Sequence, residues 1–204
     1  MKSKKIIFFA IVFVLIVILG IFLWKAYKQP DTGLVFFEDF EIKETENNKV
    51  ISQKETNFEI TIPKDWDILD AGDSISLKCL NLYIDNESSN KYFLPIPKNG
   101  CAFNFSIDKG IDSISYSYVL GVLELCLKKP DDDYCDYDVI EIDNNKSLKH
   151  VSHVENELTL GDHIIIQVPQ NENVYIFEAY LFGQDKEECA QKFEKILETV
   201  SVTK

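Results

Sequence analysis

The sequence FEITIPKDWDIL occupies residues 58–69 and changes its character at a proline. Apolar and polar residues alternate from 58 to 62, a pattern typical of a strand with one buried face. Pro63 cannot donate the next ladder hydrogen bond, and the large aromatic Trp66 follows three residues later. The stretch therefore predicts a strand that ends at Pro63. We interpret Trp66 as a core residue, with a platform that stacks on a ligand as the alternative.

The surrounding sequence continues the strand pattern. Residues 50–55 and 58–62 predict a hairpin around Thr56 and Asn57. Evenly spaced turns after this hairpin indicate an antiparallel arrangement. Further strands are predicted at residues 74–85, 101–107, 137–142, 148–155, 159–168 and 174–182.

Two segments predict helices. Residues 112–129 alternate like a strand at first, but 18 residues are long for a strand and a helical stripe is present, so a helix is preferred. That stripe consists of Ile114, Tyr118, Gly121, Val122 and Leu125. Residues 185–200 begin with Asp185 and Glu188 in a capping-box-like arrangement. Their apolar stripe consists of Cys189, Phe193, Ile196, Leu197 and Val200.

The N-terminal segment predicts a membrane anchor. Residues 6–24 contain no charge over 19 positions, enough for a helix to cross a hydrocarbon core of ~30 Å. The run is longer than the apolar part of a signal peptide, and no small-x-small cleavage site follows it. Three lysines precede it and two follow closely, which favours a cytoplasmic N-terminus. We therefore expect a single-pass protein of the plasma membrane that contacts the lipid bilayer through residues 6–24.

These elements predict an α+β fold: a transmembrane helix followed by an antiparallel β-sheet with helices packed on it. The expected divisions are a cytoplasmic stub with the anchor at residues 1–27, a linker at 28–44 and an extracytoplasmic domain at 45–204.

The charge of the chain argues against nucleic acid as a partner. The net charge is −13 and every one of the 21 basic residues is lysine. From residue 25 onward, 18 lysines face 34 carboxylates, so this part carries about −16 charges and would be repelled by a phosphate backbone. Without arginine there is also no bidentate fork to recognise phosphate or guanine.

Five cysteines in an exported domain suggest disulfides, with at least one cysteine left over. Cys126 and Cys135 are the expected pair because only eight residues separate them. Cys189 is expected to be a buried free thiol, and a pairing of Cys79 with Cys101 depends on the strand register. The alternative is that all five are buried thiols.

The clearest candidate for a metal site is an acidic loop. The sequence PDDDYCDYD at residues 130–138 supplies Asp131, Asp133, Asp136 and Asp138, hard oxygen ligands suited to weak binding of a divalent cation such as calcium. The spacing is not that of an EF-hand. No other cofactor is expected. His150 and His153 point to opposite faces of a strand, which argues against zinc.

The motif F-x-I-x-I-P-x-x-W at residues 58–66 resembles one in the PsbP-like family. These are extrinsic photosystem proteins with many bacterial relatives, commonly anchored to a membrane. The late hairpin at 164–182 and the terminal F-x-x-I-L at 193–197 are similar to that family too. The resemblance covers about residues 45–203. It implies a single turn at PKDW, after which Trp66 folds back over one end of the sheet.

No nucleophile, P-loop or metalloprotease motif is present. The sequence therefore favours a non-catalytic extracytoplasmic module that binds or assembles another envelope component, with a protein as partner. The alternative is a metal-dependent or hydrolytic ectoenzyme that uses the acidic loop 131–138. Residues 86–100 form a long loop whose apolar residues would mark an interface if exposed, although packing onto the sheet is preferred. These residues are Tyr92, Phe93, Leu94 and Ile96.

Overall fold

The computed structural model describes residues 33–78, 83–84, 97–110, 114–130, 135–156 and 159–202. The chain divides into two units, residues 1–32 and 33–204, and the description below concerns the second. The predicted span at 6–24 lies outside the described residues. Among the helices that are described, none is long and apolar enough to cross a membrane.

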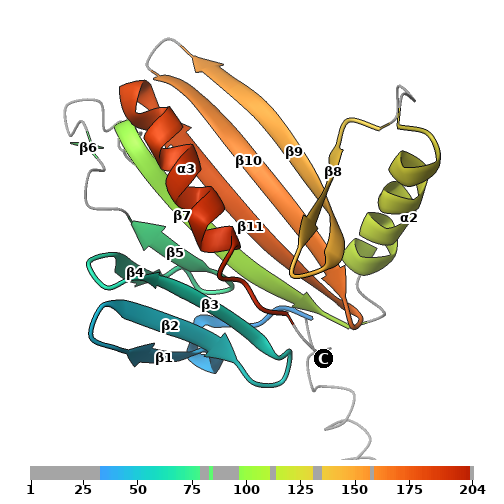
Figure 1. Cartoon of the computed structure of the whole chain (residues 1–204), viewed down its shortest axis with the longest axis horizontal. Helices are drawn as coiled ribbons and strands as arrows, with labels where there is room; N and C mark the ends of the chain where they lie inside the picture. The colour runs from blue at the N-terminus through green and yellow to red at the C-terminus, as the bar shows by residue number, and fades with distance from the viewer. Residues whose placement is uncertain are drawn as a thin grey trace, which may run out of the picture. The chain divides into compact units, whose positions relative to one another are not determined.

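The described strands form two antiparallel sheets (Figure 1). The larger sheet has the order β4-β5-β7-β11-β10-β9-β8, with β6 paired to β7, and the smaller has the order β1-β2-β3. The strands of the smaller sheet are β1 (Glu41–Glu44), β2 (Asn48–Gln53) and β3 (Phe58–Pro63). Those of the larger sheet are β4 (Asp67–Asp70), β5 (Ile75–Lys78), β6 (Tyr83–Ile84), β7 (Pro97–Lys109), β8 (Asp138–Ile142), β9 (Asn145–Asn156), β10 (Thr159–Gln170) and β11 (Asn173–Phe182).

Two tight turns fix the register of the long hairpins. Asp143 and Asn144 join β8 to β9, and Asn171 and Glu172 join β10 to β11, all four with positive φ. Two central residues with positive φ match the right-handed twist of the flanking strands, and Asp and Asn adopt this conformation readily. The first turn places Ile142 opposite Asn145, and the second places Gln170 opposite Asn173, as two-residue hairpins require.

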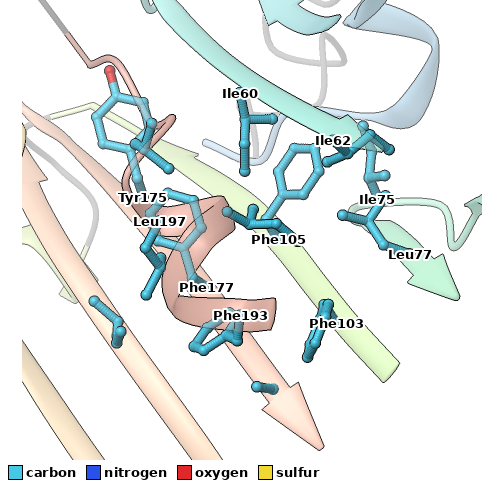
Figure 2. Close-up of a cluster of buried hydrophobic side chains, with 14 of the residues drawn as sticks. Ile60, Ile62, Ile75, Leu77, Phe103, Phe105, Tyr175, Phe177, Phe193 and Leu197 are labelled. Carbon is cyan, nitrogen blue, oxygen red and sulfur yellow. The ribbon is translucent and has the colours of Figure 1, made fainter. Parts of the chain in front are cut away.

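The main core lies between the larger sheet on one side and the smaller sheet with α3 (Lys186–Leu197) on the other (Figure 2). Phe58 from β3 stands at its centre, with its ring 5.2 Å from Phe105 and 5.8 Å from Tyr175. The Tyr175 hydroxyl donates a hydrogen bond of 2.6 Å to the carbonyl of Thr56, so the one polar atom of this ring is satisfied although the side chain is fully buried.

The stretch FEITIPKDWDIL at residues 58–69 folds as expected. β3 ends at Pro63, and the Trp66 N–H donates to the Pro63 carbonyl over 3.2 Å, which closes a single turn. Trp66 is 5% exposed and its ring lies 5.2 Å from Phe103, which in turn lies 5.2 Å from Phe193 of α3. Trp66 is thus a core residue, as predicted, and its ring is connected to α3 through Phe103 of β7.

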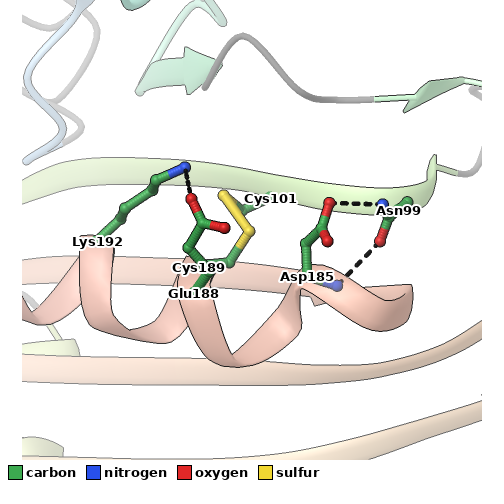
Figure 3. Close-up of a disulfide and its surroundings, with 6 residues drawn as sticks. All are labelled: Asn99, Cys101, Asp185, Glu188, Cys189 and Lys192. Carbon is green, nitrogen blue, oxygen red and sulfur yellow. Dashed lines mark hydrogen bonds and ion pairs between the residues drawn. A yellow bond between two sulfur atoms is a disulfide. The ribbon is translucent and has the colours of Figure 1, made fainter.

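Helix α3 is held to β7 at its N-terminal end (Figure 3). A disulfide joins Cys189 to Cys101 of β7, with Cα atoms 5.7 Å apart. The buried stripe was predicted correctly, but the free thiol at Cys189 was wrong. The capping box was also wrong, because the Asp185 carboxylate instead accepts a 2.6 Å hydrogen bond from the Asn99 amide, whose oxygen accepts the Asp185 N–H at 3.1 Å.

Helix α2 (Ile114–Lys128) packs on the opposite face of the larger sheet. The prediction of a helix is confirmed, but its apolar stripe was only partly right: Val122 packs against the buried cluster, whereas Tyr118 is 56% exposed. The fully buried residues of α2 are Val119, Leu123 and Cys126, which cluster with Leu148 and Val174. The structure contains the expected Cys126–Cys135 disulfide, with Cα atoms 5.3 Å apart. The bridged Cys126 lies on the side of α2 that faces the sheet.

Two boundaries differ from the sequence prediction. The compact unit begins at Gly33, whereas residues 28–44 were expected to be a linker. Val35 is fully buried and Phe40 nearly so, because the N–H of Val35 bonds to the carbonyl of Ile107 and the Phe40 ring packs edge-on to Phe105. The single strand predicted at 74–85 is present only as β5 and β6 within its described part.

Candidate functional site: an acidic groove beside helix α3

Helix α3 covers only part of the sheet face on which it lies. It contacts β7, β11 and β3, while β8 and β9 extend beyond it on the same sheet (Figure 1). A groove is left between α3 and these outer strands, with a volume of about 450 Å³. This volume falls within the range of ordinary ligand and side-chain binding sites. We call it the acidic groove.

The floor of the acidic groove is apolar. Alternate residues of β8 turn their side chains to the α3 side of the sheet, so Ile140 and Ile142 face the groove while Val139 and Glu141 alternate with them. Leu197 of α3 closes the other side. The apolar lining consists of Ile140, Ile142, Ile166, Leu197 and Val200.

The rim is strongly negative. Three carboxylates line it, from Asp143, Glu194 and Glu198, against one lysine, Lys149, among the described lining residues. The Asp143 carboxylate accepts a 2.9 Å hydrogen bond from the Val202 N–H and thereby fixes the chain end beside the groove. Within the described part of the chain, Glu194 and Glu198 have no ion-pair partner. Their charges are therefore free to meet a cation from outside.

The predicted calcium loop is only partly described. Asp131 and Asp133 lie outside the described residues, while the side chains of Asp136 and Asp138 are exposed to solvent. No group of three His, Cys, Asp or Glu residues that could hold a metal is found among the residues that the structure places. Cation binding at Asp131, Asp133, Asp136 and Asp138 stays a prediction.

The other interface residues predicted from the sequence, Tyr92, Phe93, Leu94 and Ile96, also lie outside the described residues.

The histidines do not gather at one place. His153 Nδ1 lies 2.6 Å from Asp162, whereas His150 Nδ1 lies 2.9 Å from the carbonyl of Asp136 on the other face of the sheet. His163 stacks on Tyr180 with ring centroids 4.2 Å apart, and its buried Nε2 has no hydrogen bond among the described residues, with Glu178 3.8 Å away. Burial lowers the pKa of His163, an effect that Glu178 opposes and His150 strengthens.

The sequence analysis missed the acidic groove, although α3 carried a signal for it. Glu194 and Glu198 are four residues apart and so share one side of the helix, next to the buried stripe. The sequence does not reveal that this side faces Ile140 and Ile142, because the register between α3 and β8 is a tertiary feature.

Comparison with known proteins gives the following result. No protein-family model matches the chain, and no curated protein sequence matches it. Among solved structures it is similar to a Bacteroides thetaiotaomicron protein (14% identity, TM-score 0.47, covering 72% of this chain and 45% of that one). It is also similar to a variant of the protein Mog1 (8% identity, TM-score 0.39, covering 76% of this chain and 96% of that one).

This chain spans under half of the Bacteroides protein. A third similar structure is the cyanobacterial PsbP of Synechocystis sp. PCC 6803, at 8% identity and a TM-score of 0.47, covering 78% of this chain and 95% of that one. The structures similar to this chain thus include a PsbP, a member of the family that its sequence motifs resemble.

Proposed function

We propose that this protein is a membrane-anchored, extracytoplasmic and non-catalytic module that binds or assembles another component of the cell envelope. The observation that carries the proposal is the acidic groove, a hollow lined by apolar residues whose rim carries Glu194 and Glu198, two carboxylates with no ion-pair partner among the described residues. An apolar floor with a charged rim is the composition of a binding surface.

The chemistry of the groove defines the partner. Apolar side chains of the partner would be buried against the floor beside Ile140 and Leu197. Lysine or arginine side chains of the partner would pair with Glu194 and Glu198 at the rim. The partner is therefore a protein segment that carries both apolar and basic residues. Since the rim charges are exposed, we expect binding to weaken as salt rises.

Capture from a detergent extract of cells tests the groove. The bait is the full chain with an affinity tag at its N-terminus, far in sequence from α3. The variant Glu194→Lys with Glu198→Lys reverses two rim charges on an exposed side of the helix. The matched control, Glu44→Lys with Glu172→Lys, makes the same change at exposed positions away from the groove.

A partner held in the groove is captured by the wild type and by the control, and its yield falls at least about tenfold with the groove variant. Capture of the bait alone, or the same partners at the same yield with both variants, contradicts the proposal.

The location is tested separately. An amine reagent that cannot cross membranes should label lysines of residues 33–204 on intact cells. Labelling only after lysis would place this domain in the cytoplasm and remove the envelope from the proposal.

A further inference from the structure

A second hollow lies on the other flank of α3, between this helix, the end of β3 and Trp66. Its volume is about 250 Å³. Its apolar walls are formed by Ile62, Pro63, Trp66 and Ile196. The remaining lining includes Lys192 and Lys195, from one side of the helix, and we call the hollow the lysine pocket.

The lysine pocket departs from the charge of the whole chain. Acidic residues outnumber lysines 34 to 21 in the sequence, yet the described residues that line this pocket include two lysines and no carboxylate. The acidic groove, which borders the same helix, is lined by the carboxylates of Asp143, Glu194 and Glu198 and by one lysine among the described residues. A local reversal of charge beside an apolar wall indicates an anionic ligand.

The two lysines are in different states. Lys192 pairs with Glu188, one turn earlier, over 2.8 Å, and this contact lowers the pKa of Glu188 (Figure 3). Lys195 has no ion-pair or hydrogen-bond partner among the described residues and is exposed. The ammonium group of Lys195 is therefore available to an anion without breaking an existing contact, with Lys192 one turn away as a second positive charge.

The walls of the pocket are held in place by the fold. The Thr199 hydroxyl accepts the Thr61 N–H at 3.0 Å and lies 2.9 Å from the Thr61 carbonyl, which ties the end of α3 to β3. Lys49 donates a 2.7 Å hydrogen bond to the carbonyl of Trp66. Because the walls are already formed, little ordering entropy opposes binding.

We propose that the lysine pocket binds a short apolar carboxylic acid as a free molecule. The carboxylate meets Lys195, with Lys192 behind it, and the hydrocarbon part lies against Pro63 and the exposed edge of Trp66. The pocket is smaller than the ~300–1,000 Å³ that larger ligands occupy, which limits the length of the chain. Apolar walls favour a monoanion with a hydrocarbon tail over phosphate, which needs more donors. This site is independent of the proposed partner in the acidic groove.

Fluorescence of Trp66 gives a direct test. The chain has two tryptophans, so the variant Trp24→Phe leaves Trp66 as the only one. We would titrate this full chain, in a neutral detergent, with hexanoate and with hexanamide, which has the same length but no charge. We expect hexanoate to change the Trp66 emission saturably and hexanamide to bind at least about tenfold more weakly.

Variants assign the effect to the pocket. In the same background, Lys195→Gln should weaken hexanoate about three- to tenfold, within the range of an exposed to partly desolvated charge pair. Lys146→Gln removes the same charge at an exposed position in the β8–β9 hairpin and should leave binding unchanged. A further titration measures the affinity for a short peptide whose last residue is apolar. The peptide is used in two forms, one with a free C-terminal carboxylate and one with an amidated C-terminus.

Four results would overturn the proposal. The first is no saturable response to hexanoate, and the second is equal affinity for hexanoate and hexanamide. The third is an equal effect of Lys195→Gln and Lys146→Gln on hexanoate binding. The fourth is tighter binding of the free-acid peptide than of hexanoate, which would assign the pocket to the chain end of a polypeptide.

Discussion

The two flanks of α3 use one short helix for opposite chemistries. On one side Glu194 and Glu198 form the rim of the acidic groove; on the other, Lys192 and Lys195 line the lysine pocket. Between them the buried stripe of the helix packs on the sheet. The acidic rim agrees with the net charge of −13, so composition alone accounts for its sign. The lysine pocket opposes that charge, and is for this reason the more specific of the two features.

The largest loss in the free energy of unfolding should come from removing the disulfide that anchors α3, since both hollows border this helix. The Cys101–Cys189 disulfide closes 88 residues of chain and anchors α3, whereas Cys126–Cys135 closes only 9 and lies beside α2. The chain-entropy estimate is about 4–5 kcal/mol for the first and about 2.5–3 kcal/mol for the second. Denaturant unfolding of Cys189→Ser and Cys126→Ser variants of residues 33–204, without reductant, should show this order. An equal or larger loss in Cys126→Ser would mean that the 88-residue loop does not set the stability of α3.

A change at Trp66 should affect the lysine pocket and leave the acidic groove intact. Trp66→Ala removes a 5% exposed ring that contacts Phe103, and we expect a loss of about 3 kcal/mol in the free energy of unfolding. The variant should no longer respond to a carboxylate, as judged by calorimetric titration, but should still capture the groove partner. A loss below about 1 kcal/mol would instead identify Trp66 as a surface platform, the alternative that the sequence left open.

The smallest effect concerns His163, which lies on neither flank. Burial lowers its pKa below 6.5, so as pH falls below 6.5 the unfolded chain takes up a proton before the folded one does. The wild type should therefore lose stability between about pH 7.5 and 5.5, and His163→Gln should lose less. Urea midpoints at the two pH values measure the difference. Identical pH dependence in both proteins would show that the proton on His163 is not linked to folding.

The strands and helices could be predicted well because the apolar residues of each recur with the period of that element. Alternation from Phe58 to Ile62 and the helical stripe through Phe193 are local patterns that survive packing. Helix α2 shows the limit of this reasoning. Its sequence is apolar on several sides, so periodicity could not choose between the stripe through Tyr118 and the one through Val119, and contact with the sheet decides.

The two hollows beside α3 were less predictable than the strands and helices. Both hollows combine residues from α3 with residues far away in sequence, Ile140 for the acidic groove and Ile62 for the lysine pocket. Only the placement of the helix on the sheet brings them together. The Cys101–Cys189 bridge was missed for the same reason, since its partners are 88 residues apart and the local pattern showed only that Cys189 is buried.

Photocrosslinking in intact cells tests the central claim, that the two flanks of α3 hold different classes of molecule. A photoreactive amino acid is placed at Glu198 on the rim of the acidic groove, at Asn48 beside the lysine pocket, and at exposed Glu172 as a control. We predict a crosslinked protein of higher mass from position 198 and none from positions 48 and 172. No adduct at position 198, or the same protein adduct at positions 198 and 48, would contradict the account.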